Sequence, residues 1–76
     1  MNKDRRKQID EAIAELDHLK EVFENIRDEE QEYYDNMPEN LQGGEKGEQA
    51  DAAISSLEDV ISSIEEAMSS AEESKT

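Results

Sequence analysis

The sequence contains no cysteine, which excludes disulfide bonds and thiolate metal sites and is typical of a protein in a reducing cytosol. It also has no run near the roughly 18 consecutive apolar residues that a membrane-spanning helix needs. The basic first ten residues are not followed by the apolar core of a signal peptide. These absences predict a cytoplasmic protein that does not enter a membrane.

Basic residues are scarce in this chain of 76 residues, which has 8 Lys and Arg against 22 Asp and Glu and a formal net charge of −14 at pH 7. Residues 1–7 hold four of the basic residues and only one acid. We treat residues 1–8 as a basic N-terminal end, with Asn2 or Asp4 as a helix cap. The acidic remainder repels nucleic acids and anionic membranes. We therefore expect no direct nucleic-acid binding, and a partner with a basic protein surface.

Proline and glycine, which interrupt helices, are confined to one region. Pro38 is the only proline, and the three glycines are Gly43, Gly44 and Gly47. Proline disfavours helical angles at the residue before it, and the glycine pair favours a chain reversal. This pattern predicts a turn over residues 38–48, with about one helical turn beginning at Pro38.

Before this turn, apolar residues recur every seven positions in two series. With the heptad positions labelled a to g, position a holds Ile9, Leu16, Phe23, Glu30 and Met37, and position d holds Ala12, Leu19, Ile26 and Tyr33. This spacing predicts a helix over residues 9–37. Ile13 at position e and Val22 at position g widen the apolar stripe, which favours contact with more than one neighbouring helix.

An internal repeat follows the turn. Residues 54–60, 61–67 and 68–74 read ISSLEDV, ISSIEEA and MSSAEES. Position a of this repeat holds Ile54, Ile61 and Met68, and position d holds Leu57, Ile64 and Ala71. The repeat predicts a second helix over residues 49–73. Its stability must come from packing, because the serine pairs lower its intrinsic helix propensity.

A short connection that contains glycine implies antiparallel neighbours. The predicted fold is therefore all-α: a single domain that forms an antiparallel two-helix hairpin with heptad packing. The register we prefer places Ile26 opposite Ile61 and Arg27 near Glu58. Two helices cannot cover the whole stripe of the first one, so we expect self-association into a homodimeric four-helix bundle or a larger helical oligomer.

No residue pattern predicts catalysis or a cofactor. Glu15 and His18 have the Glu-x-x-His spacing of di-iron helix bundles, but His18 occupies the outward position c and no matching buried glutamates accompany it. The acidic run at 28–32 lacks the spacing of an EF-hand, and residues 43–47 lack the pattern of a phosphate-binding loop. The serine pairs have no base at a productive spacing. We predict that the protein is not an enzyme, has no metal site and needs no cofactor.

Three groups of residues remain as candidate interaction sites. The tip group, at the end of the first helix, consists of Glu30, Tyr34, Asp35, Asn36 and Met37. The acidic group, in the second helix, consists of Glu58, Asp59, Glu65, Glu66, Glu72 and Glu73. The basic group, a candidate anion-binding site, consists of Lys3, Arg5, Arg6 and Lys7. In the tip we expect an exposed Tyr34 and a packed Tyr33. The structural alternatives are a packed hairpin end, an acidic surface that only confers solubility, and a solvated helix end.

The segment from about residue 28 to residue 68 resembles small acidic proteins of tailed bacteriophages. The resemblance rests on EEQEYYDNMPENLQGGEKGEQADAAISSLEDVISSIEEA, in which a helix, a turn of the form DNMPENLQ and an acidic second helix follow one another. It implies an accessory phage protein in the host cytoplasm that acts against a host enzyme or defence system.

The predicted function is that of a non-enzymatic interaction protein. It would bind and inhibit a host protein, either a defence protein or one that acts on nucleic acids, through its carboxylate-rich surface and as a nucleic-acid mimic. One alternative is an oligomeric sponge for a signalling nucleotide that uses Lys3, Arg5, Arg6 and Lys7. The other is a structural coiled-coil adaptor that binds through apolar surface.

Overall fold

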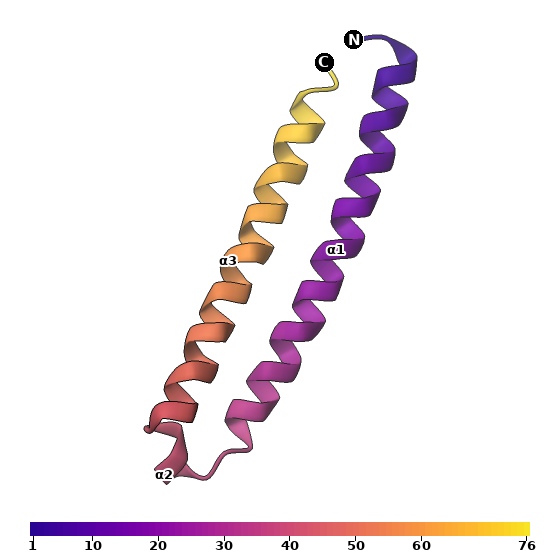
Figure 1. The fold of residues 1–76 in the computed structure, drawn as a ribbon. Helices are drawn as coiled ribbons and strands as arrows, with labels where there is room; N and C mark the ends of the chain where they lie inside the picture. Colours follow the sequence, from indigo (N-terminus) through magenta and orange to yellow (C-terminus); the bar gives the residue numbers. More distant parts are fainter.

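The computed structural model describes all 76 residues, and 87% of them are helical with no strand. Helix α1 spans Lys3–Asp35, α2 is a single turn over Glu39–Gln42, and α3 spans Glu45–Glu73. The two long helices lie side by side, α2 sits at their connection, and both chain ends lie at the other end of the rod (Figure 1). The prediction of an all-α protein is confirmed.

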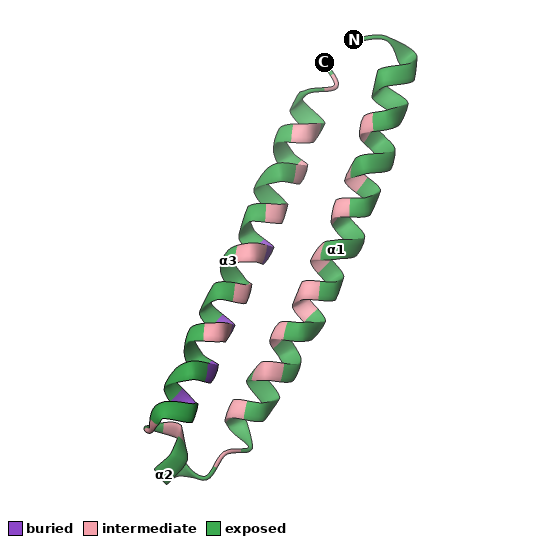
Figure 2. Ribbon diagram, in the orientation of Figure 1, coloured by how far each residue is buried: buried purple, intermediate pink, exposed green.

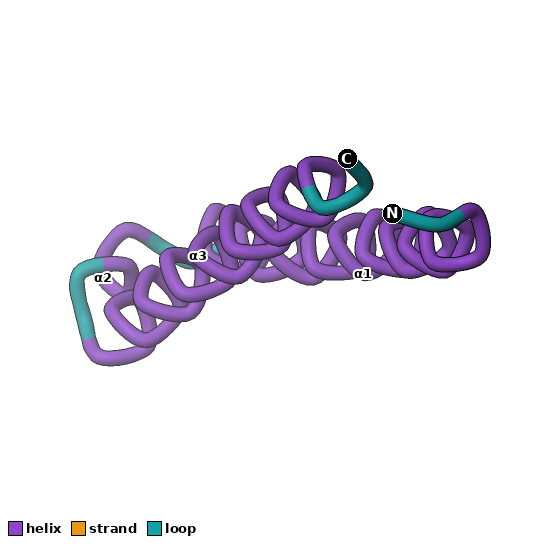
Figure 3. The backbone as a smooth tube through the Cα atoms, turned by 90° about the horizontal axis from the view of Figure 1, so that it is seen from above, coloured by secondary structure: helices purple, strands orange, loops and turns teal.

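The molecule is elongated. Its Cα atoms extend over 58 × 15 × 11 Å, and the non-helical segments lie at the two ends of the rod (Figure 3). The Cα radius of gyration is 17.3 Å, compared with about 11 Å for a compact domain of this length. Neither long helix contains an apolar stretch that could cross a membrane.

Helix α1 begins well before the expected start at Ile9. The side chain of Asn2 caps it, because its Oδ1 accepts a 2.8 Å hydrogen bond from the backbone N–H of Arg5. This bond satisfies one of the N–H groups that the first turn of a helix leaves free. The basic residues 3–7 therefore form the first turns of α1 rather than a separate end.

The connection is built from backbone and side-chain hydrogen bonds around Pro38. Helix α1 ends at Asp35, and the carbonyl of Pro38 then accepts from the N–H groups of Leu41 and Gln42 at 2.8 and 3.1 Å. The amide of Gln42 donates to the backbone carbonyl of Tyr34 at 3.1 Å. This bond joins α2 to the last turn of α1.

Gly47 is buried inside the first turns of α3, where the sequence predicted the end of the turn over residues 38–48. A Cβ atom on Gly47 would overlap the carbonyl group of Gln42 and lie 2.7 Å from the Cα of Gln42. Glycine is therefore required for the close approach of α2 to α3. Glycine has a low helix propensity, but the packing of Gly47 against Gln42 compensates for it. Helix α3 therefore begins before Gly47, at Glu45.

The core is small. Only Ala50, Ile54 and Ile61 are buried apolar residues, and all three belong to α3 (Figure 2). The side of α3 that faces α1 follows positions a and d, as the repeat predicted. Its partly or fully buried members are Gly47, Ala50, Ile54, Leu57, Ile61, Ile64, Met68 and Ala71.

Helix α1 presents a different row from the predicted one. The residues that are half-buried at regular spacing occupy positions a and e: Ile9, Ile13, Leu16, Lys20, Phe23, Arg27, Glu30, Tyr34 and Met37. Leu19, Ile26 and Tyr33, at position d, are exposed. The predicted seam positions of Ile26 and Tyr33 are therefore wrong, and α1 is turned by roughly 50° from the expected orientation.

The width of the α1 stripe explains this rotation. Row a/e contains Ile13 and Tyr34 together with the aliphatic stems of Lys20 and Arg27, which can pack while their charged ends stay in water. Rows a/d and a/e of α1 therefore both offer enough apolar contact to line a seam. Periodicity alone does not distinguish between them.

Candidate functional site

The helix pair has an apolar face. Leu19, Val22, Ile26 and Tyr33 of α1 keep 46%, 37%, 42% and 51% of their surface exposed. They occupy positions d and g, in a direction roughly 100° away from the row that contacts α3. Because the two helices run in opposite directions, position g of α3 turns to the same side. It supplies small residues there: Ala53, Val60 and Ala67.

The opposite side of the pair is acidic. By the same helical arithmetic, position b of α1 and position e of α3 line this side in two rows. The α1 row consists of Asp10, Asp17 and Glu24, and the α3 row of Asp51, Glu58, Glu65 and Glu72. We call these seven residues the acidic face.

Lys75 joins the two acidic rows at one end. Its Nζ atom lies 2.7 Å from Oδ1 of Asp10 and 2.8 Å from Oε2 of Glu72. The hydrogen bonds to Asp10 and Glu72 raise the pKa of Lys75 above its usual value of 10.5. These contacts place one carboxylate from each long helix on the same edge of the pair.

Farther along, no lysine or arginine forms an ion pair with the acidic face. A shift of one heptad from Asp10 and Glu72 leads to Asp17 and Glu65, and a second shift leads to Glu24 and Glu58. None of these four carboxylates takes part in an ion pair. Their charges therefore remain available to a cationic partner.

Arg27, which was expected near Glu58, makes no ion pair with it. The guanidinium of Arg27 instead pairs with its sequence neighbour Asp28 at 3.0 Å. Rotation of α1 has moved Arg27 into the row that packs against α3, where its side chain is 30% exposed. Glu58 is left free on the acidic face.

The predicted acidic group divides into two rows. Glu58, Glu65 and Glu72 belong to the acidic face, beside α1. Asp59, Glu66 and Glu73 occupy position f, which points directly away from α1. All six are exposed. The row of three at position e therefore has the carboxylates of α1 beside it, whereas the row of three at position f does not.

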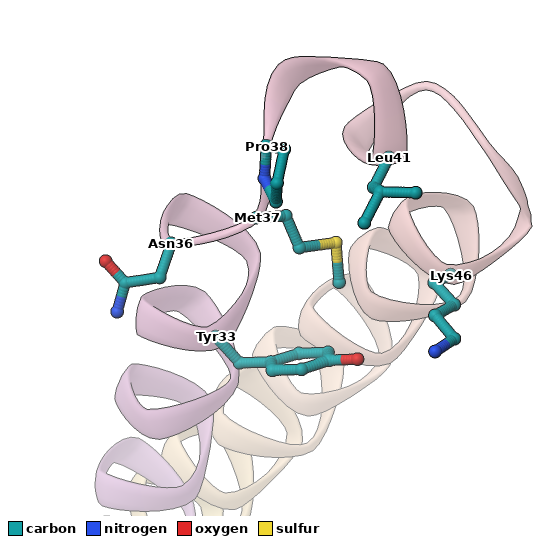
Figure 4. Close-up of a pocket in the computed structure, with 6 residues that line it drawn as sticks. All are labelled: Tyr33, Asn36, Met37, Pro38, Leu41 and Lys46. Atoms are coloured by element: carbon teal, nitrogen blue, oxygen red, sulfur yellow. The ribbon is translucent and has the colours of Figure 1, made fainter.

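A hollow of about 310 Å³ opens at the connected end of the rod. It is lined by Tyr33, Asn36, Met37, Pro38, Leu41 and Lys46. In Figure 4 the ring of Tyr33 extends beneath the side chains of Met37 and Leu41, and Asn36 points away from them. Three of the six lining residues are hydrophobic.

Only part of the predicted tip group reaches this hollow. Asn36 and Met37 line it, whereas Tyr34 and Glu30 are half-buried on the side of α1 that contacts α3. Asp35 is exposed and accepts a 3.0 Å hydrogen bond from Gln31. Glu30 faces α3 without a hydrogen bond or an ion pair of its own.

The expected roles of the two tyrosines are reversed. Tyr33 is exposed and Tyr34 is half-buried, because the rotation of α1 exchanges positions d and e. Sequence reasoning also missed Pro38, Leu41 and Lys46 in the hollow. An assignment of the α1 seam to positions a and e would have identified Tyr33, but no local pattern marks Lys46.

The basic group lies at the start of α1 and is exposed, so its role as an anion-binding site stays a prediction. Lys3, Arg5, Arg6 and Lys7 lie within little more than one turn of α1; Lys3, Arg6 and Lys7 share one side of the helix, and Arg5 points to another side. Arg6 donates two hydrogen bonds to the backbone carbonyl of Met1, at 2.7 and 3.2 Å. No cluster of three His, Asp or Glu side chains has a geometry that could hold a metal ion.

No protein-family model, no curated protein and no solved structure matches this chain. The similarity to acidic bacteriophage proteins therefore stays a prediction.

Proposed function

We propose that this protein is a non-enzymatic interaction protein that binds a basic protein surface through its acidic face. The main support is the pair of carboxylate rows, one from each long helix, with Lys75 as the cation between them at one end. The net charge of −14 adds long-range attraction for a cationic partner. Two aligned rows present more charge per unit area than either helix alone.

In its sharper form, the proposal is that the acidic face occupies the nucleic-acid groove of a host protein and inhibits it. Regularly spaced carboxylates would replace phosphates against lysine and arginine, and would release the counterions that condense on such surfaces. A phage-type accessory protein that acts on a host defence or nucleic-acid enzyme fits this chemistry.

The scaffold we propose for this function is an antiparallel hairpin that self-associates into a four-helix bundle. A core of three buried apolar residues and the exposed apolar face of α1 support this arrangement. A chain of this size is marginally stable as a monomer, and association is one of the usual reinforcements when disulfides and metals are absent.

A structural coiled-coil adaptor is the second candidate. The exposed apolar face favours it, because an apolar helix face is a common docking surface for a helix of another protein. Such an adaptor would bind through Val22 and its neighbours, and its complex would depend weakly on salt.

The decisive experiment compares two double variants that each remove two negative charges. Glu58→Gln with Glu65→Gln alters the acidic face, and Asp59→Asn with Glu66→Gln alters the outward row. Each is used to capture proteins from a bacterial lysate at about 50 mM and about 500 mM salt. We expect the wild type to capture a nucleic-acid-binding protein at low salt, and DNA and high salt to release it.

The acidic-face variant should lose at least about tenfold of this capture, and the outward-row control should lose much less. If the two variants lose the same amount of captured protein, binding depends on total negative charge and not on the acidic face. A complex that survives high salt and is insensitive to DNA would contradict it.

A further inference from the structure

We infer that the apolar face binds a second copy of this chain, with the two α1 helices packed antiparallel to each other. The inference rests on the proposed self-association and identifies its surface and orientation. It is carried by three observations: the shape of the apolar face, the total area that the chain exposes, and the distribution of charge along α1.

The apolar face has the form of a helix-packing seam. Leu19, Val22 and Ile26 form an uninterrupted row on α1, bounded at position g by Glu15 and Glu29. The row is about 20 Å long between those two residues, at 1.5 Å per residue. Its direction lies roughly 100° from the row that contacts α3, which is close to the angle between the two neighbours of a helix in a four-helix bundle.

The α3 side of this face leaves room for an approaching helix. Position g of α3 carries only small or short residues beside the row, namely Ala53, Val60 and Ala67. A second α1 helix could therefore lie in the shallow groove between α1 and α3 and contact both. Long charged side chains in this groove would have prevented such contact.

The exposed area matches the need of a stable dimer. The chain exposes 5615 Å², about 900 Å² more than the roughly 4,700 Å² of a compact monomer of its mass. A standard protein interface buries about 800 Å² from each partner. One face-to-face contact would therefore bring the exposed area of each chain to the ordinary range.

The charge along α1 selects the antiparallel orientation. Residues 3–7 carry four basic side chains, whereas residues 28–35 carry five acidic side chains and no basic one. An antiparallel pair with Leu19 near Val22 of the other copy places Arg6 opposite Asp35, so the basic end of each copy reaches the end of its partner's acidic segment. A parallel pair would place like charges together along both ends.

This dimer is isologous, because the same surface of each copy meets itself across a two-fold axis. The acidic faces lie opposite the apolar faces, so they point outward on the two sides of the dimer. The basic group, which forms no ion pair within one chain, acquires a partner in the acidic end of the second copy. Its function is then to orient assembly rather than to bind a nucleotide.

The first test compares Val22→Asp with Ser62→Asp by analytical ultracentrifugation. Both variants add one negative charge at an exposed helix position, but Ser62 lies outside the apolar face. We expect wild type and Ser62→Asp to dimerise at micromolar concentration, and Val22→Asp to raise the dissociation constant about 100-fold or more. Circular dichroism checks that the variants stay helical. Dimerisation of Val22→Asp equal to that of the control would overturn the inference.

The second test measures the orientation. The chain has no cysteine, so Asp4→Cys provides one attachment site for a spin label. In the antiparallel dimer the two labels should be about 50 Å apart along the helix axis, compared with less than about 25 Å in a parallel pair. A short distance would overturn the antiparallel arrangement while leaving self-association in place.

The remaining outcomes separate this inference from the proposed function. A wild type that is monomeric throughout would overturn self-association and this seam, whereas the capture experiment with Glu58 and Glu65 would still test the acidic face. A different result would be that the wild type is monomeric and captures a helical protein, and that Val22→Asp abolishes this capture. The apolar face would then bind another protein rather than a second copy, as in an adaptor. If the protein dimerises but its acidic face captures no protein, the proposed dimer contact stands and only the function proposed for the acidic face is contradicted.

Discussion

The two long helices use their apolar residues differently. Helix α3 contributes all three buried apolar residues, and in its repeat over residues 54–74 positions b, c, e and f hold only serine and acids, so its apolar side consists of positions a and d with short residues at g. Helix α1 has apolar residues at a, d, e and g, and contributes no fully buried residue. A helix with one apolar row has its orientation determined by that row, whereas a helix with a wide stripe can serve two neighbours.

The largest expected effect comes from two matched isoleucine truncations. Ile61 of α3 is 5% exposed and Ile26 of α1 is 42% exposed. Ile61→Ala should destabilise the fold by about 2–4 kcal/mol, or unfold it, because it opens a cavity in a core of three residues. Ile26→Ala should cost less than about 1 kcal/mol in the monomer. Urea unfolding followed by circular dichroism at high dilution measures both.

Protein concentration sharpens this comparison. If α1 meets a second copy through Ile26, the loss caused by Ile26→Ala should grow as the concentration rises into the dimeric range. The loss caused by Ile61→Ala should change much less. Equal losses for the two variants at high dilution would show that α1 is not turned as described here.

A pair of glycine substitutions tests the contact between α2 and α3. Gly47→Ala should destabilise the fold by about 1–3 kcal/mol, because the added methyl group overlaps the backbone of Gln42 and no side-chain movement can relieve it. Gly43→Ala is the control. An added Cβ there meets nothing within 4 Å, and a neutral or slightly stabilising effect is expected. Equal melting temperatures for the two variants would contradict the close approach at Gly47.

The smallest expected effect concerns Lys75. Its folded-state pKa is raised by Asp10 and Glu72, so its contribution to stability is complete below the unfolded pKa and is lost as pH rises through the raised folded value. The melting temperature of the wild type should therefore fall slightly as the pH rises through and above about 10.5. In Lys75→Met this fall in melting temperature should be absent. In the control Lys46→Met, which removes a lysine without an ion pair, the fall should remain.

Much of the fold follows from local patterns. The heptads predicted two long helices, the Pro38 region predicted the interruption, and the ISSLEDV repeat predicted which side of α3 packs. Asn2 was named as a cap, but the helix was predicted only from residue 9 because residues 3–8 hold no apolar residue; a cap and a run of good helix formers suffice there. The start of α3 was missed because Gly47 lowers local propensity, and its contact with Gln42 is visible only in three dimensions.

The candidate sites were less predictable than the helices. The carboxylates of α3 were identified, but their α1 counterparts Asp17 and Glu24 were not, because their row becomes meaningful only when α1 is placed against α3. In the tip group the expected exposures of Tyr33 and Tyr34 were exchanged. That error follows from one rotation of α1, which moves all its heptad positions together.

The sequence alone determined the helical content, the place of the interruption, the inward side of α3 and the surplus of negative charge, because each depends on residue type and short-range spacing. Only the tertiary structure decided the rotation of α1, and with it the separation of an apolar face from an acidic face. The physical reason is that rows a/d and a/e of α1 offer comparable apolar contact. The choice between them depends on how both rows pack against α3 and on the lysine and arginine stems that row a/e can accommodate.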